Sequence, residues 1–478
     1  MTREPMSRVD AAWLHMDRPE NTADIVALLR LDGPLSPARL RTLLQDRLVT
    51  HDRFRARVVD TGALGQPVWE RDPHFSLARH LSARTLRGEG REALEEVVSE
   101  AATRPLAPGR PPWRACLIDG GEQSAVLVKL HHCMADGFAL LTVLLGLSDE
   151  RAGRAAPPEA GPPAPPDAAP GPLPRGARAL LGDPLAAARS LWKMATLPEA
   201  RGRLAPPALT GLRRTSWSHP WPLAGLRDAA HAAGATVNDA LLAALSGALS
   251  RVLRDPAAPG APGPLPDEVR ALVPVNLRPG PPAAGTPLGN QFGLVFLDLP
   301  IEPLALDERL ELMRGRTAAM KRSPDAWVAL GILGALGLAP AALERLGTAF
   351  FSRKASMVVT NVPGPARRLH FGGRRVDELL FWVPHPAALG LGVSLLSYAG
   401  QVTVGVRADA AFPLDPRALA HAIDEELAAL VPRPARAGRA RAAAAAPEHA
   451  GRQAAFAGAP AGRRVRVIEA GPATSPAS

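Results

Sequence analysis

The sequence predicts an α/β fold made of two halves. Apolar, strand-like runs alternate with segments of helical spacing along most of the 478 residues, a length that suffices for two domains. Nine prolines between Pro157 and Pro174 interrupt this pattern, and such a segment can form neither helix nor sheet. We therefore expect an N-terminal half over residues 1–150, a linker and crossover over 151–203, a C-terminal half over 204–431 and a disordered tail over 432–478.

Composition and charge argue against one class of partner. Hydrophobic residues make up 46% of the chain and charged residues 21%, as in globular proteins. The net charge is +10, of which residues 432–478 carry +6, and only four of the 56 basic residues are lysines. Abundant Ala, Gly and Pro accompany the arginines, a composition typical of GC-rich coding sequence. The basic charge is therefore explained without a nucleic-acid partner, and we expect none. The tail is too poor in large apolar residues to fold alone, and it is either a solvated extension or a contact for anionic lipid headgroups.

Two features bear on the cellular setting. Cys116 and Cys133 are the only cysteines and residues 1–10 are polar and charged, which favours a reduced, cytoplasmic environment. Residues 326–343 contain no charged residue over a length near the lower limit for a membrane span. This segment is rich in glycine and contains Pro340, so we expect a buried or substrate-lining helix. Docking at a membrane surface and a membrane span are the alternatives.

Capping residues and apolar spacing predict the elements of the N-terminal half. Ser7 and Asp10 introduce a helix, and an edge strand follows over residues 24–31. Ser36 is an N-cap before Pro37 at the first helical position, so this helix continues to about residue 49. The remaining elements are strands over 114–118 and 124–130 around a turn at 119–121, and an apolar helix over 138–145.

The C-terminal half is predicted in the same way. Thr236 is an N-cap with Asp239 three residues later, before an amphipathic helix. A β-branched strand ends at Asn361, because residues 363–365 are Pro-Gly-Pro and force an extended turn. The other elements are strands over 269–275 and 293–299, a hairpin over 390–397 and 401–407, and a closing helix over 415–431.

Two imidazoles and a carboxylate stand where the strand over 124–130 gives way to the helix over 138–145. Residues 131–137 are His-His-Cys-Met-Ala-Asp-Gly. Four interpretations are possible. The side chains are satisfied polar groups that close the strand end, they bind a metal ion, Cys133 is a nucleophile, or one imidazole is a general base. Neighbouring side chains on an extended backbone diverge, which argues against the metal site and against a Cys133–His132 pair. We favour the general base, with Asp136 as a structural charge held between rigid elements.

This pattern, HHxxxDG, resembles the signature of the CoA-dependent acyltransferase superfamily, which includes chloramphenicol acetyltransferases and peptide-synthetase condensation domains. Over roughly residues 5–431 the chain is similar to the bacterial wax ester synthase/diacylglycerol acyltransferase family. The similar stretches are Ser-x-x-Asp at 7–10, Pro-Pro-Trp at 111–113 in place of Pro-Leu-Trp, Asn-Leu-Arg-Pro at 276–279, Gly-Asn at 289–290, Asn-Val-Pro-Gly-Pro at 361–365 and Leu-Leu-Ser-Tyr-Ala-Gly at 395–400. The resemblance implies two chloramphenicol-acetyltransferase-like, condensation-domain-like halves with a central channel.

The resemblance also implies roles for single residues. The catalytic residues are His132, His131 and Asp136: His132 is the general base, and Asp136 pairs with an arginine for which Arg278 is a candidate. Gly137 lets the chain turn into the helix without a Cβ clash. Asn290, Asn361 and Trp113 orient the acyl carbonyl or line the channel, while loop capping by Asn290 and core packing by Trp113 are the alternatives.

The implied reaction is transfer of a fatty acyl group from acyl-CoA to diacylglycerol, which gives triacylglycerol, and also to long-chain alcohols, which gives wax esters. Acyl-CoA is then a substrate, and neither a cofactor nor a metal ion is implied. A membrane or lipid-droplet surface is a further peripheral partner. The alternatives are a condensation-type transferase whose acyl donor is bound to a carrier protein, and a catalytically silent lipid-binding homologue.

Overall fold

The computed structural model describes residues 3–62, 66–88, 90–150, 184–200, 204, 208–255, 265–278, 288–337, 341–385 and 387–431, of which 341–345 are described by their backbone alone. The proline-rich stretch 157–174 and the predicted tail lie outside these residues, whereas residues 184–200 of the predicted linker and crossover are described and contain a helix, α6 (Pro184–Thr196). The described elements fall within the unit Met1–Pro432.

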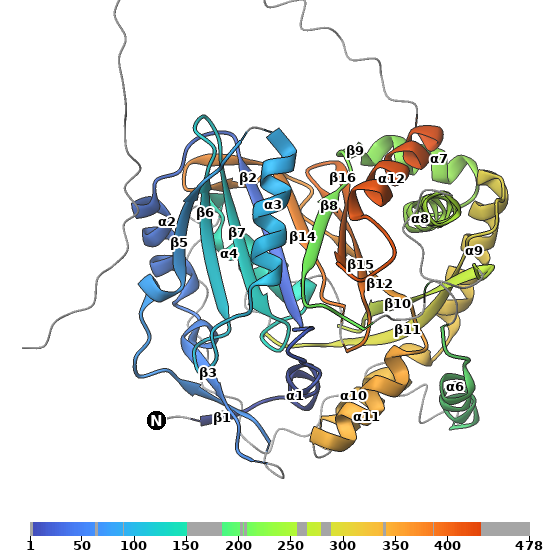
Figure 1. The fold of residues 1–478 in the computed structure, drawn as a ribbon, viewed down its shortest axis with the longest axis horizontal. Coiled ribbons are helices and arrows are strands. Elements are labelled where there is room, and N and C mark those ends of the chain that lie inside the picture. The colour runs from blue at the N-terminus through green and yellow to red at the C-terminus, as the bar shows by residue number, and fades with distance from the viewer. Residues whose placement is uncertain are drawn as a thin grey trace, which may run out of the picture. The chain divides into compact units, whose positions relative to one another are not determined.

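One sheet carries the histidine motif (Figure 1). Its strands, in spatial order, are β13 (His370–Phe371), β14 (Arg374–Trp382), β2 (Asp24–Leu31), β7 (Ser124–His131), β6 (Trp113–Asp119) and β5 (Leu81–Thr85). The prediction that residues 24–31 form an edge strand is wrong, because β14 pairs with β2 on the side opposite β7. Strands that are buried on both sides need near-continuous apolar sequence, and β2 and β7 have it.

A second sheet is built from the later part of the chain. Its strands, in spatial order, are β11 (Phe292–Pro300), β10 (Glu268–Asn276), β12 (Met357–Pro363), β15 (Leu391–Tyr398), β16 (Gln401–Asp409) and β8 (Arg213–Trp217), with β9 (Trp221–Pro222) also paired to β16. The strand predicted to end at Asn361 continues to Pro363, because Val362 and Pro363 lie in register with residues 396 and 397 of β15. A small third sheet contains β1 (Arg3–Pro5), β4 (Val68–Arg71) and β3 (Ala56–Val59).

The helices pack on these sheets and on one another (Figure 1). They are α1 (Arg8–His15), α2 (Pro37–Leu43), α3 (Gly90–Thr103), α4 (Gly137–Leu147), α6 (Pro184–Thr196), α7 (Leu223–Ala232), α8 (Val237–Arg254), α9 (Leu306–Arg322), α10 (Asp325–Leu336), α11 (Ala341–Ser352) and α12 (Pro416–Leu430). The predicted caps are present: Ser36 caps α2, which continues as a π-helical turn over Leu44–Leu48, and Thr236 and Asp239 form a capping box on α8.

The apolar segment predicted over residues 326–343 is divided between two helices. Helix α10 ends at Leu336, and α11 begins at Ala341. In the described part of the chain no single helix is both long and apolar enough to cross a membrane, although the bent pair α7 and α8 passes on length and composition together. The inner face of α10 lines an apolar cavity, as expected for a substrate-lining helix.

Candidate active site

The motif places its two histidines in different surroundings. Strand β7 ends at His131, and the backbone N–H of His132 donates to the Ala23 carbonyl at 2.8 Å, which anchors the turn to the segment before β2. Asp136 then caps α4, since its Oδ1 accepts a hydrogen bond from the Ala139 N–H at 2.9 Å. The local chemistry therefore fixes the backbone on both sides of His132.

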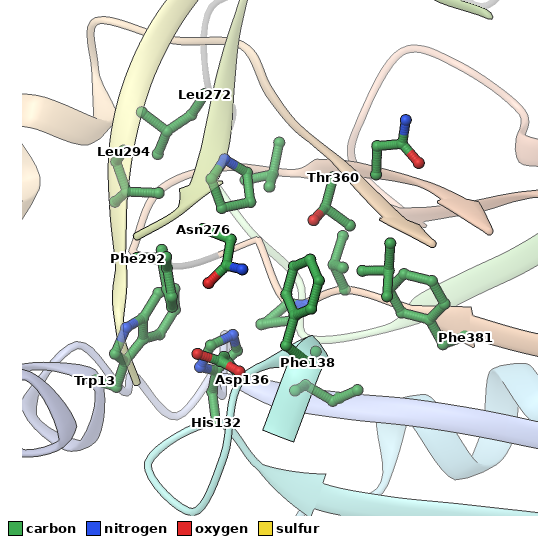
Figure 2. Close-up of a pocket in the computed structure, with 18 residues that line it drawn as sticks. Trp13, His132, Asp136, Phe138, Leu272, Asn276, Phe292, Leu294, Thr360 and Phe381 are labelled. Carbon is green, nitrogen blue, oxygen red and sulfur yellow. The ribbon is translucent and has the colours of Figure 1, made fainter. Parts of the chain in front are cut away.

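The His132 ring lines a cavity of about 130 Å³ between the two sheets (Figure 2). It stacks on the indole of Trp13 and meets Phe292 edge-on, with ring centroids 4.0 Å and 5.7 Å away. Its Nδ1 atom is buried without a hydrogen-bond partner. Burial, and secondly the charge of His131, lower the pKa of His132 to about 3, so the ring is neutral near pH 7.

His131 is held away from this cavity. Its Nε2 lies 3.0 Å from Oδ2 of Asp17, and its Nδ1 lies 3.1 Å from the backbone nitrogen of Cys133. Burial opposes protonation of the ring, but Cys133 and the Asp17 carboxylate outweigh it and raise the pKa of His131 well above the ordinary value. His131 is thus tied into the surrounding structure, while His132 is the imidazole that faces open space.

Asp136 and Arg278 form a buried ion pair at the edge of the cavity. Arg278 Nη1 donates to Asp136 Oδ2, which also accepts from the Gln291 N–H at 3.1 Å, and Arg278 Nη2 donates to the Gly289 carbonyl at 2.7 Å. The sequence named Arg278 as a candidate partner, and the structure shows that contact. With both of its oxygens engaged, Asp136 connects the histidine motif to the loop before β11.

Asn290 lies behind His132 rather than in the cavity wall. Its Nδ2 donates to the His132 carbonyl at 2.8 Å and to Oδ1 of Asp10 at 2.7 Å. Asp10 also accepts from the Asn290 backbone N–H at 2.9 Å, and burial raises the pKa of its carboxyl group. The side-chain amide that was expected at the acyl carbonyl or channel wall therefore holds the backbone of His132 itself.

The other three candidate residues lie around the cavity in different ways. Gly137 lines it, and a Cβ there would lie 3.1 Å from Val362 of β12, so glycine permits this close approach. Asn361 also lines it and donates to Oδ1 of Asn238 at 2.9 Å. Trp113 is buried behind the wall, where its Nε1 donates to the Phe54 carbonyl at 2.8 Å and its ring stacks on His80.

The sequence did not identify several residues that complete the site. Trp13, Phe292 and Thr360 line the cavity, and so does Asn276, the first residue of the Asn-Leu-Arg-Pro stretch (Figure 2). Trp13 could have been predicted as a site residue, because it is the aromatic residue that follows the Ser-x-x-Asp stretch at residues 7–10. The contacts of Phe292 and Thr360 depend on the approach of the two sheets, which residue spacing does not encode.

Two apolar cavities of about 70 Å³ each adjoin the central one. The first shares Leu272 and Leu294 with it and continues among α6, α10 and α11. The second shares Val362 and Phe381 with it and continues beneath α4 and the Leu44–Leu48 turn. Since almost all of the lining of both is apolar, the arrangement suits long hydrocarbon chains that converge on His132.

Three comparisons with known proteins, by family model, by sequence and by structure, find the same family. Residues 6–197 match the model of the wax ester synthase/diacylglycerol acyltransferase catalytic domain, and residues 288–431 match that of the WS/DGAT C-terminal domain. A probable diacylglycerol O-acyltransferase of Mycobacterium tuberculosis is 30% identical over 464 residues, which cover 89% of this chain and 95% of that protein.

Solved structures share the fold. A wax ester synthase/diacylglycerol acyltransferase from Marinobacter aquaeolei VT8 superposes with a TM-score of 0.63 at 23% identity, covering 89% of this chain and 98% of that one. The first condensation domain of the CDA synthetase gives a TM-score of 0.55 at 19% identity, with 89% and 97% covered. The predicted α/β class with two acyltransferase-like halves is confirmed.

Proposed function

The chain belongs to the wax ester synthase/diacylglycerol acyltransferase family, and on that premise we propose that it transfers a fatty acyl group from acyl-CoA to diacylglycerol, and also to long-chain alcohols. The observation that carries this proposal is the position of one neutral imidazole, His132, in a cavity from which two apolar cavities extend. Acyl-CoA is a substrate in this proposal, and no cofactor takes part.

The proposed chemistry is general-base catalysis by His132. The acceptor hydroxyl gives its proton to the ring as its oxygen attacks the thioester carbonyl, and the C–S bond then breaks. The imidazolium gives the proton to the leaving CoA sulfur, and the His132 ring is neutral again at the end of the reaction. Nε2 is the proposed acceptor atom, since Nδ1 is sealed in the protein. The low pKa of His132 keeps the ring unprotonated in the resting enzyme.

Developing charge on the thioester oxygen needs a hydrogen-bond donor. We propose Asn276, whose side chain lines the cavity opposite His132 (Figure 2). Its Oδ1 accepts from the Arg278 N–H at 3.1 Å, so the oxygen of the amide is already engaged and Nδ2 is the atom proposed as the donor. The same arginine pairs with Asp136, so a single residue positions both the motif and the proposed donor.

The setting follows from the substrates. Long-chain diacylglycerols reside in membranes and lipid droplets, so we propose that the protein works at the surface of such a phase. A cavity that selects chain-bearing alcohols by apolar contact separates them weakly, at about 1–3 kcal/mol per methylene group, which supports the use of both acceptor classes.

The experiment is an acyl-transfer assay with purified full-length protein. Labelled palmitoyl-CoA is supplied with dioleoylglycerol or with hexadecanol, and the lipid products are separated. We expect labelled triacylglycerol as the main product and labelled wax ester as the second. Formation of neither product while the protein remains folded would contradict the proposal, and transfer from a carrier-protein thioester alone would indicate condensation-type chemistry instead.

A further inference from the structure

Exposed large apolar side chains are concentrated on two helices. Five of the seven such residues in the described part of the chain lie on α6 and α11. They are Leu185 (70% exposed), Leu191 (50%), Trp192 (72%), Leu346 (69%) and Phe350 (38%), which we call the α6–α11 surface. Scattered exposed apolar residues are normal, but three of them, one a tryptophan, on a single 13-residue helix are typical of an interaction site.

Helix α6 places most of its apolar side chains in solvent. Only Ser190 and Met194 of this helix are buried, whereas Leu185 and Trp192 lie seven residues apart on the opposite face. The helix is nevertheless fixed to the protein. The Lys354 ammonium group, just after α11, donates to the Ala195 and Leu197 carbonyls at 2.8 Å and 2.6 Å. The exposure therefore belongs to an anchored helix, and Lys354 brings the C-terminal ends of α6 and α11 together.

The inner faces of the same helices wall an apolar cavity. Met194 of α6, Leu333 of α10 and Phe351 of α11 line the cavity that adjoins the His132 cavity through Leu272 and Leu294. In the described part of the chain, these helices lie between their solvent-facing side and the cavity that adjoins the site.

The charged side chains of α6 are all basic. Arg189 and Lys193 flank Trp192 on α6, which carries no acidic residue, and Arg353 follows α11. Lys193 and Arg353 also contact Asp325 and Glu199, and their side chains stay 63% and 55% exposed. Basic side chains beside exposed Trp and Leu are typical of helices that lie in the headgroup region of an anionic membrane.

We propose that the α6–α11 surface docks on an anionic lipid bilayer and that the acceptor reaches the active site from there. This inference rests on the proposed function, because it assigns the entry side of a lipid-borne acceptor. Trp192 and Leu185 insert below the headgroups, and Arg189 and Lys193 remain among the lipid phosphates. The apolar cavity behind α10 then receives one acyl chain of the acceptor.

The test compares two double variants of the full chain. Leu185→Glu with Trp192→Glu alters the α6–α11 surface, and Leu212→Glu with Leu312→Glu alters the two other exposed leucines as the matched control. Flotation is measured with phosphatidylcholine vesicles that contain about 30% phosphatidylglycerol and a few per cent dioleoylglycerol. We expect the α6 variant to lose vesicle binding about tenfold or more, and the control to bind as the wild type does.

Activity separates this inference from the proposed function. With palmitoyl-CoA and the water-soluble acceptor hexanol, the α6 variant should retain wild-type turnover, whereas its turnover of vesicle-borne dioleoylglycerol should fall with its vesicle binding. Wild-type protein that acylates neither acceptor would contradict the proposed function. An active α6 variant that still floats with vesicles, or equal wild-type binding to vesicles without phosphatidylglycerol, would contradict the docking surface. A wild-type dimer that this variant converts to a monomer would assign the surface to self-association instead.

Discussion

The imidazole of His132 lies flat on the indole of Trp13, with ring centroids 4.0 Å apart and an angle of 17° between the ring planes. Trp13 is buried on α1, far from the histidine motif in sequence. The contact removes water from one face of the imidazole and restricts its rotation. The proposed base is therefore oriented by stacking, and the dry surroundings keep it neutral.

Replacing Trp13 tests this orientation. Trp13→Phe keeps an aromatic face, so we expect turnover within a few-fold of wild type, whereas Trp13→Leu should lower kcat about tenfold through misplacement of the ring. The loss should be larger in kcat than in the apparent KM for palmitoyl-CoA, because Trp13 stacks on the base. Steady-state assays on folded protein measure the difference, and equal kcat values for the two variants would argue against a role for stacking.

Asn290 is expected to matter through the backbone of His132. Asn290→Ala removes the hydrogen bonds to the His132 carbonyl and to Asp10, at a cost of about 1–3 kcal/mol of stability because buried acceptors lose their donor. We expect kcat to fall while KM is kept. Chemical denaturation and steady-state kinetics on the same preparation provide both values. A variant with reduced stability and full turnover would leave Asn290 a structural role only.

The Asp136–Arg278 pair is expected to hold the motif loop. Asp136→Ala leaves the Arg278 charge buried without this partner and uncaps α4, so the free energy of unfolding should fall by about 3–5 kcal/mol. As the control, Glu100→Ala breaks the exposed contact with Arg84 and should cost at most about 1 kcal/mol. Denaturant unfolding compares the two. Equal losses would show that the buried pair contributes no more than a surface pair does.

The low pKa of His132 predicts a stability that depends on pH. The folded protein holds the ring neutral down to a pKa of about 3, whereas the unfolded chain takes up this proton near pH 6.5. The unfolded state therefore binds more protons between these values, and the free energy of unfolding falls as the pH is lowered from about 6.5 toward 4. His132 contributes a slope of up to about 1.4 kcal/mol per pH unit. His132→Gln should show a shallower dependence, and identical slopes would contradict the buried neutral ring.

Local sequence signals predicted most elements, because caps and apolar spacing act within a few residues. Ser36, Thr236 and the hairpin around residues 119–121 are examples. The edge-strand prediction for residues 24–31 was wrong because β14, more than 340 residues later, pairs with β2. The residues of β2 do not by themselves predict pairing with a strand so distant in sequence. The division into halves at 1–150 and 204–431 stays a prediction.

The candidate site was predictable to the extent that a motif carries it. His132, Asp136 and Arg278 were named from the sequence, and the structure brings them together at one cavity edge. Asn290 was named too, but its contact with the His132 backbone was not foreseen, because that contact depends on the packing of the loop before β11 on the motif. The roles of all these residues in catalysis remain proposals.

The most direct test of the central claim is the single-turnover rate of palmitoyl transfer to dioleoylglycerol by His132→Gln, compared with wild type and with the neighbouring His131→Gln. If His132 is the general base, its replacement lowers the rate about 100-fold or more in a protein that still binds palmitoyl-CoA, and His131→Gln has a smaller effect. A folded His132→Gln variant that keeps more than about a tenth of the wild-type rate would remove His132 from the mechanism, since a base of this kind contributes far more.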